Sequence, residues 1–287
     1  MRTALLFAAI LVLQPVVSQA RAPSGWQSVC TPLESPVKGS YCVHTDPGSA
    51  GDDVLFYFAG RGTGPMKWFE EYPAILDYWR THGSTTPTVV TMAFDTFAGW
   101  WLLTDEKPDG SPALYSFVAD ELMPRIEREL GGVRGRRLLM GRSMGGFNAI
   151  QLLSRRQRDF ERAALLCPAI LTVSSYSPAQ ETFDYMKRTG ADVFSMMVLH
   201  LFNRTSFRDD AHWKEHSPLE IGAKFLGPDT PRLHISCGMQ DHYGFQEGAE
   251  KFAELARSLS QQEVTWQPVP GNHCSFDSEA IARYFTE

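Results

Sequence analysis

The stretch GRSMGG at residues 141–146 decides the fold of this chain. The residues before it, RLLM at 137–140, predict a short strand, and residues 147–156 have the spacing of a helix. A serine between glycines at the junction of a strand and a helix has the G-x-S-x-G pattern of a sharp turn that lifts the serine hydroxyl above a sheet. Glycines avoid side-chain clashes in this strained turn, and the start of the helix favours developing negative charge. The pattern therefore predicts that Ser143 is a nucleophile.

Strands that alternate with helices lie on both sides of this turn and predict an α/β fold. Such alternation is typical of a mostly parallel central sheet with helices on both faces. Residues 168–231 supply no strand and are too many for a plain crossover, so we expect them to form an inserted lid on a single domain at 21–287. The expected strands are 53–58, 87–94, 137–140, 163–167, 232–237 and 263–268, and the expected helices are 66–82, 113–130, 147–156, 248–259 and 278–284.

A serine nucleophile needs a base, and the base needs an acid that orients it. In folds with this turn, the acid and then the histidine follow the serine along the chain, on loops after later strands. Asp241 follows the strand expected at 232–237, and His273 follows the strand expected at 263–268. Both therefore fall at the carboxyl edge of the sheet, where sites of open α/β folds lie. His242 is the one rival base, although side chains of adjacent residues tend to point apart.

The developing oxyanion of an acyl-transfer reaction needs backbone N–H donors. One expected donor is Met144, the residue after the nucleophile. The second is expected on the loop FAGRGTG at 58–64, on Arg61 with Gly62 as the alternative. This glycine-rich loop lacks the Lys-Ser/Thr ending of a phosphate-binding P-loop.

Three side chains are candidates for substrate binding. Arg142 adjoins the nucleophile and either meets a substrate carboxylate or, as the favoured alternative, forms an ion pair with an acid such as Asp95 or Asp105. Trp100 and Trp101 form either an aromatic wall for a sugar or phenolic group or a buried corner.

The expected lid contains an apolar helix around residues 194–202. This helix either lines an acyl pocket or packs on the body of the domain. Residues 203–205 (NRT) match the glycosylation sequon, a match that is common by chance.

Taken in order, the motifs resemble the putative-esterase family, the esterase D-like branch of the α/β hydrolases. They are AGRGTG at 59–64, GRSMGG at 141–146, Trp213 and Ser217-Pro218 before a strand, CGMQD at 237–241 and GNHCSF at 271–276. The resemblance covers about residues 53–287. The chain departs from the family pattern at Arg142, where an apolar residue or histidine is usual, and at Ala59-Gly60, where His-Gly is commoner.

The resemblance implies an α/β-hydrolase fold and a catalytic triad of Ser143, Asp241 and His273, with Met144 and the Arg61 loop as the oxyanion hole. The implied reaction is hydrolysis of a carboxylic ester through an acyl-enzyme. Acyl transfer by the same triad and a non-catalytic binding module on a hydrolase scaffold are the alternatives.

Composition narrows the choice of partners. The chain is 43% hydrophobic and 21% charged, with a net charge of −6, and its longest basic cluster is the short run at 134–137. Nucleic acid binding needs a basic face, so we expect none. We expect a small-molecule or polysaccharide-linked ester as substrate, with no cofactor and no metal.

The N-terminus has the pattern of a signal peptide. Arg2 is followed by an uncharged apolar stretch at 4–17 and by small residues at 18 and 20. The apolar stretch is shorter than the roughly 20 residues that cross a bilayer. We therefore expect cleavage after Ala20 and a secreted or periplasmic protein without a membrane span.

The chain has five cysteines, some of which should pair in an oxidising compartment. Cys30 and Cys42 flank a Pro/Gly/Ser-rich loop between two short strands and are the first choice for a disulfide. Cys167, Cys237 and Cys274 leave one odd thiol, and a Cys237–Cys274 bond is plausible.

Overall fold

The structure is a computed structural model that describes residues 22–82, 85–105 and 114–287. The signal peptide expected at 1–20 lies outside these residues. Across the described part of the chain, no helix combines the length and the apolar character needed to cross a membrane.

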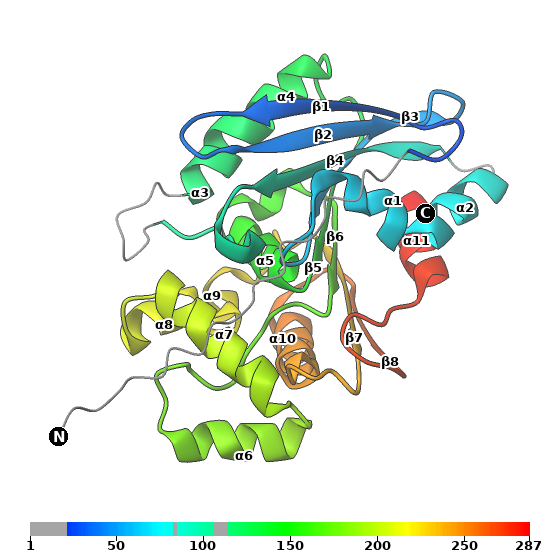
Figure 1. Ribbon diagram of the computed structural model, residues 1–287. Coiled ribbons are helices and arrows are strands. Elements are labelled where there is room, and N and C mark those ends of the chain that lie inside the picture. Colours follow the sequence, from blue (N-terminus) through cyan, green and yellow to red (C-terminus); the bar gives the residue numbers. More distant parts are fainter. Residues whose placement is uncertain (1–21, 83–84, 106–113) are drawn as a thin grey trace.

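The centre of the molecule is a sheet whose eight described strands run in the order β1-β2-β4-β3-β5-β6-β7-β8 (Figure 1). The six strands from β4 to β8 in this order are parallel, and β1 and β2 form an antiparallel pair at the edge beside β4. The expected mostly parallel sheet is therefore confirmed. The strands are β1 (Gln27–Leu33), β2 (Gly39–Thr45), β3 (Ala50–Phe58), β4 (Thr86–Phe94), β5 (Arg137–Arg142), β6 (Arg162–Leu166), β7 (Arg232–Gly238) and β8 (Val264–Val269).

Helices cover both faces of the sheet, as expected, because its strands are apolar on both sides. Side chains of β3 alternate between the faces. Leu55 and Tyr57 enter a core with α1, α2 and α11, while Phe56 and Phe58 enter the larger core with α4, α5 and α10. These helices are α1 (Trp68–Glu71), α2 (Pro73–Thr81), α4 (Met123–Glu129), α5 (Met144–Arg156), α10 (Phe245–Leu259) and α11 (Ser278–Thr286).

Prolines alter two of the expected helices. The helix expected at 66–82 divides into α1 and α2 because Pro73 follows Tyr72, whose φ of −127° leaves the helical region. The helix expected at 113–130 contains a π-helical turn at Phe117–Leu122 just before Pro124, which lacks the N–H that would continue the regular ladder. The first break ends α1 at Glu71, beside the site described below.

The segment 168–231 contains four helices and no strand. They are α6 (Ala179–Thr189), α7 (Val193–Ser206), α8 (Asp210–His216) and α9 (Pro218–Phe225). In Figure 1, α6, α7 and α8 lie together to one side of the sheet.

The disulfides match the expectation in one case and correct it in the other. Cys30 and Cys42 face each other in the β1–β2 register and are bonded, as predicted. The second bond joins Cys167 to Cys274, so the Cys237–Cys274 pairing is wrong. Cys237 lies within β7, and its thiol is buried and free, whereas Cys167 directly follows β6.

Glu247 of α10 links α10 to α6. Its carboxylate accepts hydrogen bonds from Arg188 of α6, from Thr172 and from Lys251. Burial alone would raise the pKa of Glu247, but these hydrogen bonds outweigh it and lower the pKa to about 2.

Candidate active site

Ser143 stands between the end of β5 and the start of α5 with a strained backbone, φ 54° and ψ −118°. Its main chain is held on both sides, since its N–H donates to Leu166 O (2.9 Å) and its carbonyl accepts from Ala169 N–H (2.9 Å). A Cβ at Gly145 would lie 1.8 Å from Phe58 O, so only glycine lets α5 approach β3 this closely.

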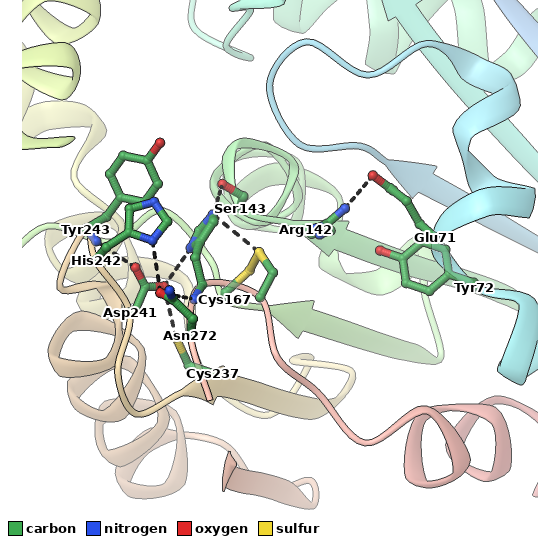
Figure 2. Close-up of a disulfide and its surroundings, with 12 residues drawn as sticks. Glu71, Tyr72, Arg142, Ser143, Cys167, Cys237, Asp241, His242, Tyr243 and Asn272 are labelled. Carbon is green, nitrogen blue, oxygen red and sulfur yellow. Dashed lines mark hydrogen bonds and ion pairs between the residues drawn. A yellow bond between two sulfur atoms is a disulfide. The ribbon is translucent and has the colours of Figure 1, made fainter. Parts of the chain in front are cut away.

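His273 lies between Ser143 and Asp241. Its Nε2 is 3.1 Å from Ser143 Oγ, and its Nδ1 is 2.7 Å from Asp241 Oδ2. With a carboxylate at Nδ1, that nitrogen carries the proton and Nε2 is free to accept one. Ser143 and Asp241 come from the turn after β5 and the loop after β7, and Figure 2 shows them at one site.

Asp241 is fixed in a buried position, with 1% of its surface exposed. Its Oδ1 accepts a hydrogen bond from Tyr243 N–H (2.8 Å), which leaves Oδ2 for His273. Burial raises the pKa of the Cys237 thiol beside it, so that residue is a neutral neighbour of the carboxylate (Figure 2).

His242, the rival base, faces Asn272 instead of Ser143. Its Nδ1 lies 3.0 Å from Asn272 Oδ1, and its ring meets the His273 ring edge to face at 5.2 Å. Asn272 Oδ1 also accepts the His273 N–H at 2.7 Å. Asn272 thus connects the loop of His242 with the loop of His273. Sequence analysis did not predict this contribution, because no local pattern identifies Asn272 as a linking residue.

The glycine-rich loop after β3 borders the same site. Gly60, Arg61 and Thr63 line the cavity, and a Cβ at Gly60 would lie 3.6 Å from Ser143 Cβ. The Gly62 N–H donates to Gly99 O (3.3 Å) and is therefore already engaged. Met144 is buried directly after the serine.

Arg142 forms an ion pair with Glu71, so the expected partners Asp95 and Asp105 are wrong (Figure 2). Asp105 pairs with Arg155 instead. Sequence analysis did not identify Glu71, because this residue reaches the site only where the helix is interrupted before Pro73.

Two buried tyrosines stand behind this ion pair. Tyr57 donates to Glu71 Oε2 (2.8 Å) and lies 2.9 Å from the Tyr72 hydroxyl. Burial raises the pKa of both tyrosines, so both hydroxyls stay protonated. The Glu71 carboxylate is therefore held by a cation on one side and a hydroxyl on the other.

A cavity of about 220 Å³ opens above Ser143 and His273. Its lining has charged and apolar side chains, which we call the charged wall and the apolar wall, and the two meet where the Arg61 guanidinium lies over the Phe202 ring at 5.1 Å. Residues of the charged wall are Arg61, Glu71 and Arg142, and those of the apolar wall are Trp100, Ala169, Val198, Leu199, Phe202 and Phe245.

The two adjacent tryptophans have different environments. Trp100 lines the cavity, stacks on Phe202 at 5.0 Å and donates to Ser206 Oγ (2.8 Å). Trp101 is 2% exposed and packs against Phe58 and Phe94, away from the cavity. Trp101 is therefore a core residue, and its assignment to substrate binding is wrong.

Helix α7 supplies much of the apolar wall, including Leu199 and Phe202, while its outer face exposes Phe194 and Met197. The sequon residue Asn203 is buried in this helix, and its side-chain N–H donates to Ser175 Oγ (2.9 Å). It is not accessible as a glycosylation acceptor in the folded protein.

The model of the family described as putative esterase matches residues 69–287. A search of curated proteins gave no match.

Three similar solved structures are esterases or a related hydrolase. They are a ferulic acid esterase (TM-score 0.61, 17% identity, covering 90% of this chain and 94% of that one), an S-formylglutathione hydrolase from Agrobacterium tumefaciens (0.60, 16%, 93% and 94%) and brefeldin A esterase, a bacterial homologue of human hormone-sensitive lipase (0.63, 14%, 93% and 73%). At these identities the likeness establishes the α/β-hydrolase fold. Because the family model covers most of the chain, the protein belongs to the putative esterase family and is a carboxylic ester hydrolase.

Proposed function

We propose that the protein hydrolyses carboxylic esters through an acyl-enzyme, with Ser143 as the nucleophile, His273 as the general base and acid, and Asp241 as the orienting carboxylate. The observation that carries this proposal is the hydrogen-bonded chain from Ser143 Oγ through both ring nitrogens of His273 to Asp241 Oδ2. Each member comes from a different loop, and such a convergence has no evident role in packing.

In the proposed reaction, Ser143 Oγ attacks the ester carbonyl while its proton moves to His273 Nε2. The tetrahedral intermediate collapses when Nε2–H protonates the leaving alcohol, which departs and leaves the acyl group on Ser143. Water then loses a proton to Nε2 and attacks the acyl carbon. Collapse of the second intermediate returns the proton to Ser143 Oγ and releases the acid. Asp241 holds the imidazole in one tautomer throughout and balances its transient charge.

We assign the oxyanion hole to the main-chain N–H groups of Met144 and Arg61. Met144 begins α5, where the helix N-terminus favours negative charge. Arg61 is favoured over Gly62 because the Gly62 N–H already donates to Gly99 O.

The proposed substrate is a neutral ester with a compact acyl or aryl group. The guanidinium of Arg142 is neutralised by Glu71, so this pair offers a substrate carboxylate no net attraction, and the other cation of the charged wall, Arg61, lies over the Phe202 ring. Trp100 provides an aromatic surface in a cavity of about 220 Å³, which takes one such group and leaves an attached sugar or polysaccharide outside. We also propose that residues 168–231 act as the lid of a single domain at 21–287, since α7 forms one cavity wall.

Export is supported by the two disulfides, which are typical of extracellular or periplasmic proteins. We propose that the signal peptide is residues 1–20.

A panel of neutral acyl and aryl esters, assayed with wild type and Ser143→Ala, tests the proposed function. Turnover is expected on at least one ester class and should vanish in the variant. Adding an alcohol or sugar to the same assay separates hydrolysis from acyl transfer, because transfer would divert the acyl group into a new ester. Turnover that persists in Ser143→Ala would reject the proposed mechanism.

A further inference from the structure

The Cys167–Cys274 disulfide lies directly beside the proposed triad. Cys274 follows His273 in the chain, and its Sγ is 3.4 Å from His273 Nε2. Cys274 also lines the cavity, whereas Cys167 is fully buried. This disulfide therefore borders the nitrogen that faces Ser143.

At its other end, the disulfide is anchored to the segment that fixes Ser143. Cys167 lies between Leu166, whose carbonyl accepts the Ser143 N–H, and Ala169, whose N–H donates to the Ser143 carbonyl. The Cys167 N–H itself donates to Ser236 O of β7 at 2.6 Å. Cys167 thus lies in a segment that is hydrogen-bonded to the main chain of the nucleophile.

Two further hydrogen bonds of the His273 loop lead to the loop that carries Asp241. Gly271 O accepts from Gln240 N–H (2.9 Å), and His273 Nδ1 bonds Asp241. These bonds tie the loop to the acid-bearing loop after β7, not to Ser143. Besides the hydrogen bond from Ser143 Oγ to His273, the disulfide is therefore a covalent link between the histidine loop and the segment that binds the main chain of Ser143.

Both cysteines have left-handed backbones, with φ of 41° at Cys167 and 57° at Cys274. Residues with a side chain rarely adopt this region unless their surroundings hold them there. Without the covalent bond, both residues can relax towards negative φ, and such a change at Cys274 displaces the adjacent His273.

We propose that the Cys167–Cys274 disulfide is a positioning element that holds His273 in register with Ser143, and that its reduction slows the chemical step while leaving substrate binding intact. This inference rests on the proposed function. In the reduction, a dithiol supplies two electrons and two protons and becomes a disulfide itself, which leaves Cys167 and Cys274 as thiols. A displacement of about 1 Å between reacting groups costs up to about 100-fold in rate.

The test compares two double variants, Cys167→Ala/Cys274→Ala and the matched control Cys30→Ala/Cys42→Ala. The control removes a disulfide of the β1–β2 edge pair that does not line the cavity. We expect the first variant to lose about 10- to 100-fold in kcat with KM within about twofold of wild type. The control should keep both values.

Two further readouts separate positioning from general loss of structure. The downfield proton resonance of the Asp241–His273 hydrogen bond should persist in the first variant, because that bond does not depend on the disulfide. Reduction of folded wild type with dithiothreitol should lower kcat to the same degree, and reoxidation should restore it. Wild type reduced in this way also serves as the test if the double variant does not fold.

A kcat within twofold of wild type, in the variant or in the reduced protein, would overturn the proposal. So would an equal loss of kcat in the Cys30/Cys42 control, because the effect would then be general. Ser143→Ala is assayed in parallel: if it retains activity, the proposed function fails, whereas an inactive Ser143→Ala beside a fully active disulfide variant rejects this inference alone.

Discussion

Replacing Glu71 by glutamine tests whether the Arg142–Glu71 pair sets the charge preference of the cavity. In wild type the pair is neutral and lines the cavity beside Ser143. The substitution keeps the size of the side chain and an oxygen for the Tyr57 hydroxyl, but it leaves Arg142 as an uncompensated cation. We therefore expect an increased preference for anionic esters.

The magnitude follows from Coulomb's law. A unit charge about 5 Å from a substrate carboxylate contributes about 3 kcal/mol at an effective dielectric constant of about 20. The Arg142 side chain is 26% exposed, so solvent screening leaves roughly half of this. About 1.5 kcal/mol corresponds to about a tenfold increase in kcat/KM for the anionic ester relative to a neutral one. The lost ion pair should also lower the free energy of unfolding by about 1–2 kcal/mol, less than for a fully buried pair.

The assay compares kcat/KM for 4-nitrophenyl butyrate and 4-nitrophenyl hemisuccinate, which differ mainly in the carboxylate. Glu70→Gln is the matched control, because Glu70 is the adjacent acid of α1 and pairs with Lys67 without lining the cavity. This control changes the net charge equally and should not change the ratio. An unchanged ratio in Glu71→Gln, or an equal change in both variants, would refute the reasoning.

Three further predictions concern the base, the aromatic wall and acid stability. His273→Ala should abolish turnover almost as fully as loss of Ser143, whereas His242→Ala should cost less than tenfold, as judged by kcat; the reverse order would reassign the base. Trp100→Ala should raise KM for aryl esters with little change in Tm, whereas Trp101→Ala should lower the free energy of unfolding by about 3–5 kcal/mol. An unchanged KM in Trp100→Ala would exclude Trp100 from substrate binding. Because its pKa is lowered, the Glu247 carboxylate contributes stability that is present above the ordinary pKa near 4.5 and is lost as the pH falls towards 2. The free energy of unfolding, measured with urea, should therefore depend less on pH over that range in Glu247→Gln than in wild type. An equal pH dependence in the two proteins would contradict this.

Local sequence signals were sufficient for the parts of the site that follow strand ends. The glycines around Ser143 are required by the close approach of α5 to β3, and that requirement is visible as a motif. Asp241 and His273 each follow a strand, and parallel strands place their carboxyl ends at one edge. Order along the chain was therefore enough to bring these residues together.

Features that depend on which loops meet were not predictable from local patterns. Glu71 reaches Arg142 because Pro73 breaks a helix that periodicity alone extends through this region. Trp100 and Trp101 are adjacent in an irregular loop, where no period tells which one turns into the core.

The same limit applies to the second disulfide. A Cys237–Cys274 bond was plausible, but Cys237 lies on the same side of β7 as Leu233 and Ile235 and is buried with them in the larger core. The pairing of Cys274 with Cys167 depends on the loops after β6 and β8 meeting at the sheet edge.

Covalent trapping of the nucleophile tests the central claim most directly. Wild type treated with an alkyl fluorophosphonate should gain one phosphonyl group, and peptide mass spectrometry should place it on Ser143. Ser143→Ala should remain unlabelled and should lose about 10⁶-fold in kcat for ester hydrolysis while keeping its fold. Labelling at another residue, or activity of Ser143→Ala within tenfold of wild type, would contradict the account.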